Sequence, residues 1–166
     1  MSVGEPAPSD SPQVQPADLA KRLGARVLDT AILGLPLLIA GLVIMLILGS
    51  AGELVWFVLF VGATYGYLAY FESTTGQTLG KQMLHLRVVG PDGRNPTRQQ
   101  ALKRNLLPAL MPLGLLLVLL PTVLAVLLLL VQLGVLIWIA VTISKSPTKQ
   151  GFHDTFAGGT YVIKTA

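Results

Sequence analysis

The chain has 166 residues, about the length of one domain; 52% are hydrophobic and only 12% are charged. Soluble domains carry roughly a quarter charged residues, so a water-soluble fold of this composition would lack the polar surface to cover itself. Cysteine is absent, which excludes disulfides, iron–sulfur clusters and thiolate zinc sites, and with only two histidines we expect no metal. The formal net charge is +4, and the basic residues flank apolar runs. We therefore expect contact with anionic lipid headgroups and no nucleic-acid partner.

The N-terminal third begins with a polar tail and continues into a first apolar run. Residues 1–17 are rich in proline and serine, and we expect a disordered cytoplasmic tail because they bury too little apolar area to offset the entropy of ordering. Asp18 is placed to cap a short basic helix that leads into the run 27–48. At ~1.5 Å per residue this run crosses a hydrocarbon core of ~30 Å, so it predicts the first membrane span.

Two further apolar regions follow. Residues 54–71 predict the second span, with aromatic residues near both ends as in interfacial belts. Residues 106–143 carry no charge, and as one straight helix they would be about 57 Å long and need a tilt of about 60°, beyond the usual range of roughly 0 to 40°. We therefore expect two spans there, 106–120 and 122–143.

The polar segments between and after the spans predict a small extramembrane layer. Within the loop 72–105, residues 84–89 alternate apolar and polar side chains and precede a turn, which indicates a short strand. A capping-box pattern at residues 97–100 then begins a helix. In the C-terminal segment 144–166, residues 160–164 predict a second strand, which we expect to pair with the first because an isolated strand is unstable.

The basic residues indicate the orientation. All twelve lie before the first span, between the second and third, or after the fourth. By the positive-inside rule we expect both termini and the central loop in the cytoplasm and the protein in the cytoplasmic (inner) membrane. An alternative with three spans would place Lys145 and Lys149 outside. The expected fold is an all-α, four-helix multi-pass membrane protein whose small cytoplasmic layer contains two short strands.

Arg26 and Asp29 lie about one turn apart at the start of the first span. An unpaired carboxylate inside a span costs about 2.5 to 3.5 kcal/mol, so we expect Asp29 to have a partner. Two interpretations stay open: an Arg26–Asp29 salt bridge that seats the span at the interface, and a functional intramembrane charge. After the fourth span, His153 and Asp154 lie between glycines, and a segment folding back would bring Asp154 towards Arg26.

The segment Gly76–Gln82 has the wrong spacing for a phosphate loop, with three residues between its glycines and a glutamine after the lysine. We therefore reject nucleotide binding. Instead we expect a turn that lets Lys81 reach headgroups or a carboxylate such as Glu72.

Four motifs in this order resemble the RDD family: Gly24–Asp29, Thr75–Lys81, Leu86–Val89 with Asp92–Gly93, and His153–Asp154 leading to Ala157–Thr160. The family is named for one arginine and two aspartates, and by position these are Arg26, Asp29 and Asp154. Gly76, Gly80, Lys81 and His153 lie in the same motifs as supporting residues. The resemblance covers residues 18–166 and implies a bacterial-type membrane protein of unsettled role, with transport suggested. The second glycine of Gly158–Gly159 departs from the pattern and leaves the register of the last strand open.

Function stays open between two main alternatives. The first is transport of an ion or small solute, in an oligomer or with a partner, although the charges stop near one end of the first span. The second is a non-enzymatic accessory subunit of a larger membrane complex or an organiser of anionic lipid. We expect no enzyme and no cofactor, because no Ser-His-Asp set, paired catalytic carboxylates or HExxH helix is present; a lipid-modifying enzyme using His153 and Asp154 is a distant third.

Overall fold

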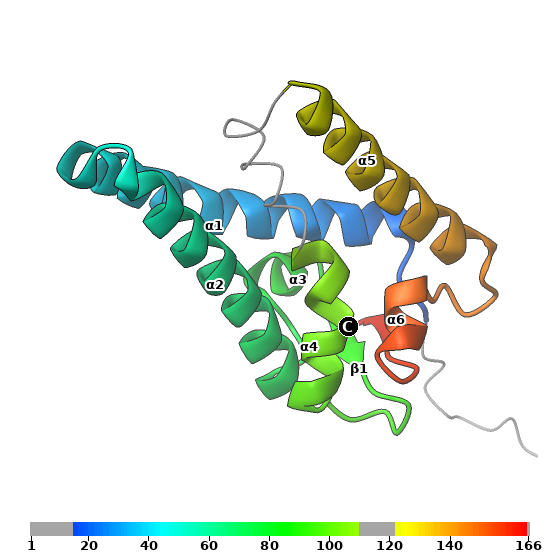
Figure 1. The fold of residues 1–166 in the computed structure, drawn as a ribbon. Coiled ribbons are helices and arrows are strands. Elements are labelled where there is room, and N and C mark those ends of the chain that lie inside the picture. Colours follow the sequence, from blue (N-terminus) through cyan, green and yellow to red (C-terminus); the bar gives the residue numbers. More distant parts are fainter. Residues whose placement is uncertain (1–14, 110–121, 166) are drawn as a thin grey trace, which may run out of the picture.

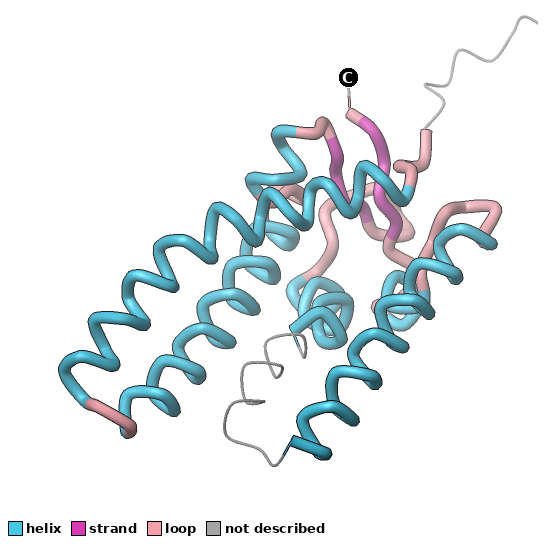
Figure 2. Tube along the Cα trace, turned by 90° about the horizontal axis from the view of Figure 1, so that it is seen from above, coloured by secondary structure: helices cyan, strands magenta, loops and turns pink. Residues whose placement is uncertain are grey.

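A computed structural model describes residues 15–109 and 122–165, which form six helices and one two-stranded sheet (Figure 1). In chain order the elements are α1 Leu19–Leu48, α2 Ala51–Thr74, α3 Leu79–Met83, β1 Leu86–Val89, α4 Arg98–Ala109, α5 Thr122–Lys145, α6 Phe152–Phe156 and β2 Tyr161–Lys164. The helices α1, α2 and α5 are long, and the remaining elements gather at one end of them (Figure 2).

The helices α1 and α2 form an antiparallel hairpin around a tight turn. Gly49 ends α1 with a φ of 58°, a left-handed conformation that favours glycine. The indole Nε1 of Trp56 donates a hydrogen bond to the carbonyl of Leu37 at 2.9 Å, which fixes the register of the two helices. At Gly52 an added Cβ would lie 2.9 Å from the carbonyl oxygen of Ile44, so the missing side chain lets the chains approach closely.

In the part of the chain that the structure describes, three helices are long and apolar enough to cross a membrane: α1, α2 and α5. They contain the expected spans 27–48, 54–71 and 122–143. The remaining expected span, 106–120, which is the third in chain order, begins within α4 and otherwise lies outside the described residues. The count of four therefore stays a prediction.

The two expected strands do pair. β1 and β2 run antiparallel with Val88 opposite Val162, and both of these side chains are buried. The first strand was expected from residue 84 but begins at Leu86, because His85 has a φ of 53° and breaks the extended backbone. The extra glycine before the second strand is accommodated in a turn in which Gly158 and Gly159 both have positive φ.

The end of the N-terminal tail adds to the free edge of β2. Ala17 N donates to the carbonyl of Val162 at 2.9 Å, and Lys164 N donates to the carbonyl of Gln15 at 3.0 Å. Ala17 is fully buried. Residues 15–17 are therefore ordered, whereas the sequence predicted a disordered tail there. The free edge of β2 supplies backbone hydrogen-bond partners, which amino-acid composition does not indicate. Residues 1–14 lie outside the described part.

The sheet β1–β2 and the short helices α3, α4 and α6 form one layer, the sheet layer. This layer joins the ends of all three long helices. The start of α1 follows the strand-like residues 15–17, and the loop after α2 accepts a hydrogen bond from β1, Val88 N to the carbonyl of Gly76 at 2.7 Å. At the end of α5, Thr142 Oγ1 accepts a hydrogen bond from the first residue of α6, Phe152 N, at 3.1 Å. The N-terminal end of α1 and the C-terminal ends of α2 and α5 therefore lie on the same side of the molecule (Figure 2).

Candidate functional site

A cavity of about 460 Å³ lies among α1, α2, α4 and α5, next to the sheet layer. One end of it holds the charged side chains and is lined by Arg22, Arg26, Asp29, Glu72, Lys81, Arg104, Asn105 and His153. The apolar residues Leu19, Leu23, Ile143 and Val162 also line the cavity. The walls beyond this end are mostly apolar and are lined by Leu33, Gly34, Phe60, Thr64, Leu68, Leu136, Ile139 and Ala140. The cavity thus changes from charged to apolar along its length.

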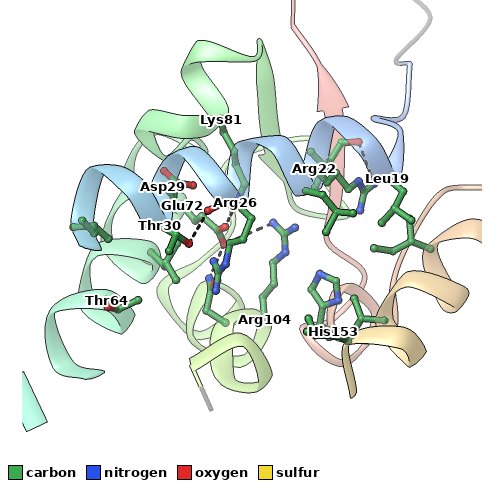
Figure 3. Close-up of a pocket in the computed structure, with 18 of the residues that line it drawn as sticks. Leu19, Arg22, Arg26, Asp29, Thr30, Thr64, Glu72, Lys81, Arg104 and His153 are labelled. Carbon is green, nitrogen blue, oxygen red and sulfur yellow. Dashed lines mark hydrogen bonds and ion pairs between the residues drawn. The ribbon is translucent and has the colours of Figure 1, made fainter. Parts of the chain in front are cut away.

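Helical spacing produces this change of polarity. On α1, Arg22, Arg26 and Thr30 follow each other at intervals of four residues, and Leu33 and Gly34 continue the same face. Because α2 runs antiparallel to α1, its charged C-terminal end lies beside the charged N-terminal part of α1. Figure 3 shows Arg26 directed from α1 into this space and Arg104 reaching up from α4, whereas Asp29 lies on the side of α1 that faces α3.

Asp29 is buried and accepts hydrogen bonds from three neutral donors. Its Oδ1 accepts from the hydroxyl of Tyr67 at 3.0 Å and from Gly80 N at 2.8 Å, and its Oδ2 accepts from Thr78 Oγ1 at 2.6 Å. The carboxylate thereby binds the first turn of α3, where backbone N–H groups lack partners within the helix. No hydrogen bond or ion pair joins Asp29 to Arg26 among the described residues, so of the two interpretations left open by the sequence, the Arg26–Asp29 salt bridge is wrong.

Gly80 is required by this close contact. A Cβ at this position would lie 2.3 Å from the carbonyl oxygen of Ala25 and 2.9 Å from Cγ of Asp29. Gly76 has a φ of 74°, and a Cβ there would lie 2.8 Å from the carbonyl oxygen of Val88. The glycines of the second motif therefore let the loop after α2 pack directly on α1 and β1.

Glu72 forms a second buried group. Its Oε1 pairs with the ammonium of Lys81, as one of the sequence-based alternatives expected. Its Oε2 accepts a hydrogen bond from Asn105 Nδ2 at 2.8 Å and lies 3.6 Å from Nη1 of Arg104. This carboxylate therefore ties α2 to both α3 and α4.

Asp154 forms the third group and is completely buried. Its Oδ2 accepts hydrogen bonds from Arg22 Nη1 and from Gly151 N, both at 3.0 Å. Its Oδ1 lies 2.8 Å from Nε of Arg104 and 3.5 Å from Nε2 of His153. The segment after α5 does fold back onto α1 as expected, but the ion-pair partners of Asp154 are Arg22 and Arg104 instead of Arg26, because Arg22 lies one turn nearer to the sheet layer.

Arg104 connects the second and third groups, since it pairs with both Glu72 and Asp154. Sequence reasoning missed it. A signal was present: Ala101, Arg104 and Asn105 occupy one face of α4 at spacings of three and four residues, and all three are buried. Two polar residues on the buried face of a helix indicate a buried polar contact.

The electrostatics around α6 favour a neutral histidine and an ionised aspartate. Burial lowers the pKa of His153 from 6.5 to about 4, and the opposing attraction of Asp154 does not restore it. Burial by itself raises the pKa of Asp154, but the charges of Arg104 and Arg22 outweigh it and leave the pKa of this carboxyl below its usual value. His153 Nδ1 is buried without a hydrogen-bond partner among the described residues.

Arg26 differs from the other cations of the site. Its side chain lines the cavity and is attracted electrostatically by the nearby carboxylates of Glu72 and Asp29. Within the described part of the chain, however, its guanidinium forms no hydrogen bond and no ion pair, whereas Arg22, Lys81 and Arg104 each contact a carboxylate. Among the residues described, four cations thus line the cavity or contact the three carboxylates Asp29, Glu72 and Asp154, and the cation without a direct partner is Arg26.

Fold and site together define a class of protein. The chain is a small membrane protein in which the sheet layer, together with its buried charged groups (the charged layer), joins the ends of long apolar helices. The charged layer lies at one end of the cavity between these helices. No curated protein and no solved structure matches it significantly. The model of the RDD family matches residues 16–158, and the chain belongs to this family of membrane proteins.

Proposed function

We propose that this RDD protein binds a small anionic solute in the cavity and takes part in its transport. The observation that supports this is the cationic excess at the charged end of the cavity, where Arg26 has no direct partner within residues 15–109 and 122–165. A buried or partly buried cation is costly unless it is paired, so a bound anion would stabilise the site. The volume of about 460 Å³ falls within the range of roughly 300 to 1,000 Å³ that is typical of small-molecule sites.

We infer that the charged layer faces the cytoplasm and that the protein lies in the inner membrane. Every lysine and arginine belongs to segments that the positive-inside rule assigns to that side. The C-terminal ends of α2 and α5 both belong to the layer, which supports a further crossing by residues 106–120 between them. Both termini would then be cytoplasmic, and the basic surface would contact anionic headgroups.

The arrangement argues against a relay of protons or cations. In α2 the ionisable acids are Glu53 and Glu72 at its two ends, and α5 carries no ionisable residue before Lys145. The charges of α1 end at Asp29, whose carboxylate is already occupied by three donors. Anion release on the opposite side would therefore need a conformational change, an oligomer or a partner protein, and we propose a non-enzymatic role.

Uptake by proteoliposomes tests this proposal. Vesicles containing the purified protein are supplied with radiolabelled benzenesulfonate, inorganic phosphate or Na⁺, and we expect accumulation of an anion but not of Na⁺. Arg26→Gln should abolish the uptake, whereas Arg94→Gln, which removes an exposed arginine of the layer, should leave it unchanged. Equal uptake by empty vesicles, wild type and Arg26→Gln would refute anion transport.

An accessory role in a larger membrane complex is the second candidate. It is supported by α5, which exposes apolar side chains over most of its described length, among them Val123, Leu127 and Val131. Such a surface suits contact with another membrane protein as well as with lipid. Purification in a mild detergent tests this candidate, which fails if the protein migrates alone as a monomer.

A further inference from the structure

We propose that the cavity binds a single-chain amphiphile with one anionic head group, of the chemical class of the long-chain carboxylates. This inference rests on the proposed function, because it identifies the class of anion that the cavity accepts. The head group would contact Arg26, and the hydrocarbon chain would lie along the apolar walls of α1, α2 and α5.

The geometry of α1 sets the direction of such a ligand. From Arg26 through Thr30 to Gly34 the lining face of the helix advances about 12 Å at ~1.5 Å per residue. The cationic side chains lie at the start of this distance, and the apolar positions Leu33 and Gly34 lie at its end. Figure 3 shows Arg26 beside Glu72 in the charged part of the site, with Thr64 of α2 well away from it.

The charge of the site selects a monoanion. Arg22 and Arg104 contact Asp154, and Lys81 and Arg104 contact Glu72, so each of these three cations already has a carboxylate partner. Only Arg26 has no direct partner among the described side chains. One added negative charge would balance the four cations against the three carboxylates, which is the condition under which buried charges are tolerated.

The apolar walls select a hydrocarbon chain over a compact polar anion. Hydroxyl groups on these walls come from Thr30 and Thr64, and the hydroxyl of Thr30 already donates to the carbonyl of Arg26 at 2.8 Å. A polar solute that filled the cavity would leave most of its own groups without hydrogen bonds, which is unfavourable. A hydrocarbon chain has no such groups and would cover the leucine, isoleucine and phenylalanine side chains of the wall.

Gly34 allows the chain site to be tested separately from the head-group site. It lines the cavity, and an added Cβ would meet no atom within 4 Å, so a side chain placed there begins in open space beside the cavity. Gly134 of α5 is equally open but does not line the cavity. Gly34→Leu and Gly134→Leu therefore form a matched pair of variants.

Binding of laurate, butyrate, dodecanol and dodecyltrimethylammonium to the purified protein in nonionic detergent is measured by calorimetry. We expect laurate to bind about tenfold or more tightly than butyrate, since two buried methylenes already correspond to about that factor. Arg26→Gln should weaken laurate binding about ten- to a hundredfold, the effect of losing a hydrogen bond to a charged group. Gly34→Leu should weaken laurate about tenfold and leave butyrate unchanged, while Gly134→Leu and Arg94→Gln should change neither.

The remaining outcomes separate the two proposals. Equal affinity for laurate and butyrate, or no effect of Gly34→Leu, would overturn the chain site while leaving anion binding intact. If neither anion binds, both proposals fail. Dodecanol or dodecyltrimethylammonium binding as tightly as laurate would overturn the assignment of an anionic head group to Arg26.

Discussion

Arg104 and Asp154 form an ion pair in which Nε of Arg104 lies 2.8 Å from Oδ1 of Asp154, and the side chains are only 6% and 0% exposed. The pair joins α4 to α6, and the second contact of Arg104, with Glu72, continues the connection to α2. Residues separated by up to 82 positions in the sequence are thereby held in one buried network. Asp154 thus has a structural role that does not depend on any ligand.

Loss of this pair should strongly destabilise the protein. Arg104→Gln leaves Asp154 with fewer cationic neighbours in a buried place, and breaking a buried pair costs about 3 to 5 kcal/mol. Thermal unfolding in detergent should show a large decrease in Tm. The matched control is Lys103→Gln, which removes the neighbouring exposed cation and should have little effect; equal Tm values for the two variants would contradict the buried network.

Gly80→Ala should also destabilise the fold. The new methyl group would lie 2.3 Å from the carbonyl oxygen of Ala25, and backbone cannot move aside as a flexible side chain can. Overpacking of this kind costs about 1 to 3 kcal/mol. Gly62→Ala is the control because nothing lies within 4 Å of its added Cβ, and it should be neutral or slightly stabilising through helix propensity. Unfolding curves that rank the two variants the other way would exclude the close contact of α3 with α1.

Asp29 and Tyr67 should be energetically coupled. Asp29→Asn replaces one acceptor oxygen by a donor and leaves a neighbouring donor unpaired, at about 1 to 3 kcal/mol. Tyr67→Phe removes the hydroxyl that donates to Asp29 and accepts from Leu79 N. In a double-mutant cycle of unfolding free energies we expect a coupling of about 0.5 to 3 kcal/mol. Strict additivity would show that the hydrogen bond contributes nothing to stability.

Stability should fall on mild acidification because of His153. Its pKa is about 4 in the folded protein and 6.5 in its ordinary state, so between these values the unfolded chain binds more protons than the folded one. Stability is therefore fully present above pH 6.5 and is lost as the pH falls towards 4, by at most roughly 3 kcal/mol. The depressed pKa of Asp154 adds a loss of the same sign at still lower pH.

The measurement is Tm in detergent from pH 7.5 to 4.5, for wild type and for two histidine variants. His153→Gln should flatten the dependence of Tm on pH. His85→Gln, which alters an exposed histidine of the same layer, should retain the wild-type dependence. If both variants behave alike, the titration of His153 is not the cause.

Cysteine labelling should report the orientation, since the natural chain has no cysteine. Four spans place Lys145 in the cytoplasm and the turn at Ser50 on the opposite side. A membrane-impermeant maleimide added to intact cells should label Ser50→Cys but not Lys145→Cys until the cells are opened. Labelling of both positions in intact cells would instead support three spans.

Local patterns in the sequence were sufficient for several features of the fold. The capping box at residues 97–100 is confirmed: Thr97 N donates to Gln100 Oε1 at 2.8 Å, and Gln100 N donates to Thr97 Oγ1 at 3.2 Å. The strand pairing and the pairing of Lys81 with Glu72 are confirmed as well. Each of these depends on neighbouring residues or on a pattern with few alternatives, so one sequence carries enough information.

The partners of Asp29 and Asp154 could not be predicted in this way. Asp29 receives its donors from residues 38 to 51 positions further along the chain, and spacing on its own helix suggested Arg26 instead. Asp154 was expected near Arg26, but the docking of α6 places it beside Arg22 and Arg104. One helical turn decides between Arg22 and Arg26, and that choice depends on how two distant segments dock.

The sequence by itself determined that this is a membrane protein of the RDD family, because long uncharged runs and clustered basic residues reflect the cost of placing charge in hydrocarbon. Only the tertiary structure decided which carboxylate meets which cation, and that Arg26 is left facing an apolar cavity. The physical reason is the difference in range: insertion into a bilayer depends on composition along one segment, whereas an ion pair needs two side chains from separate segments within about 4 Å.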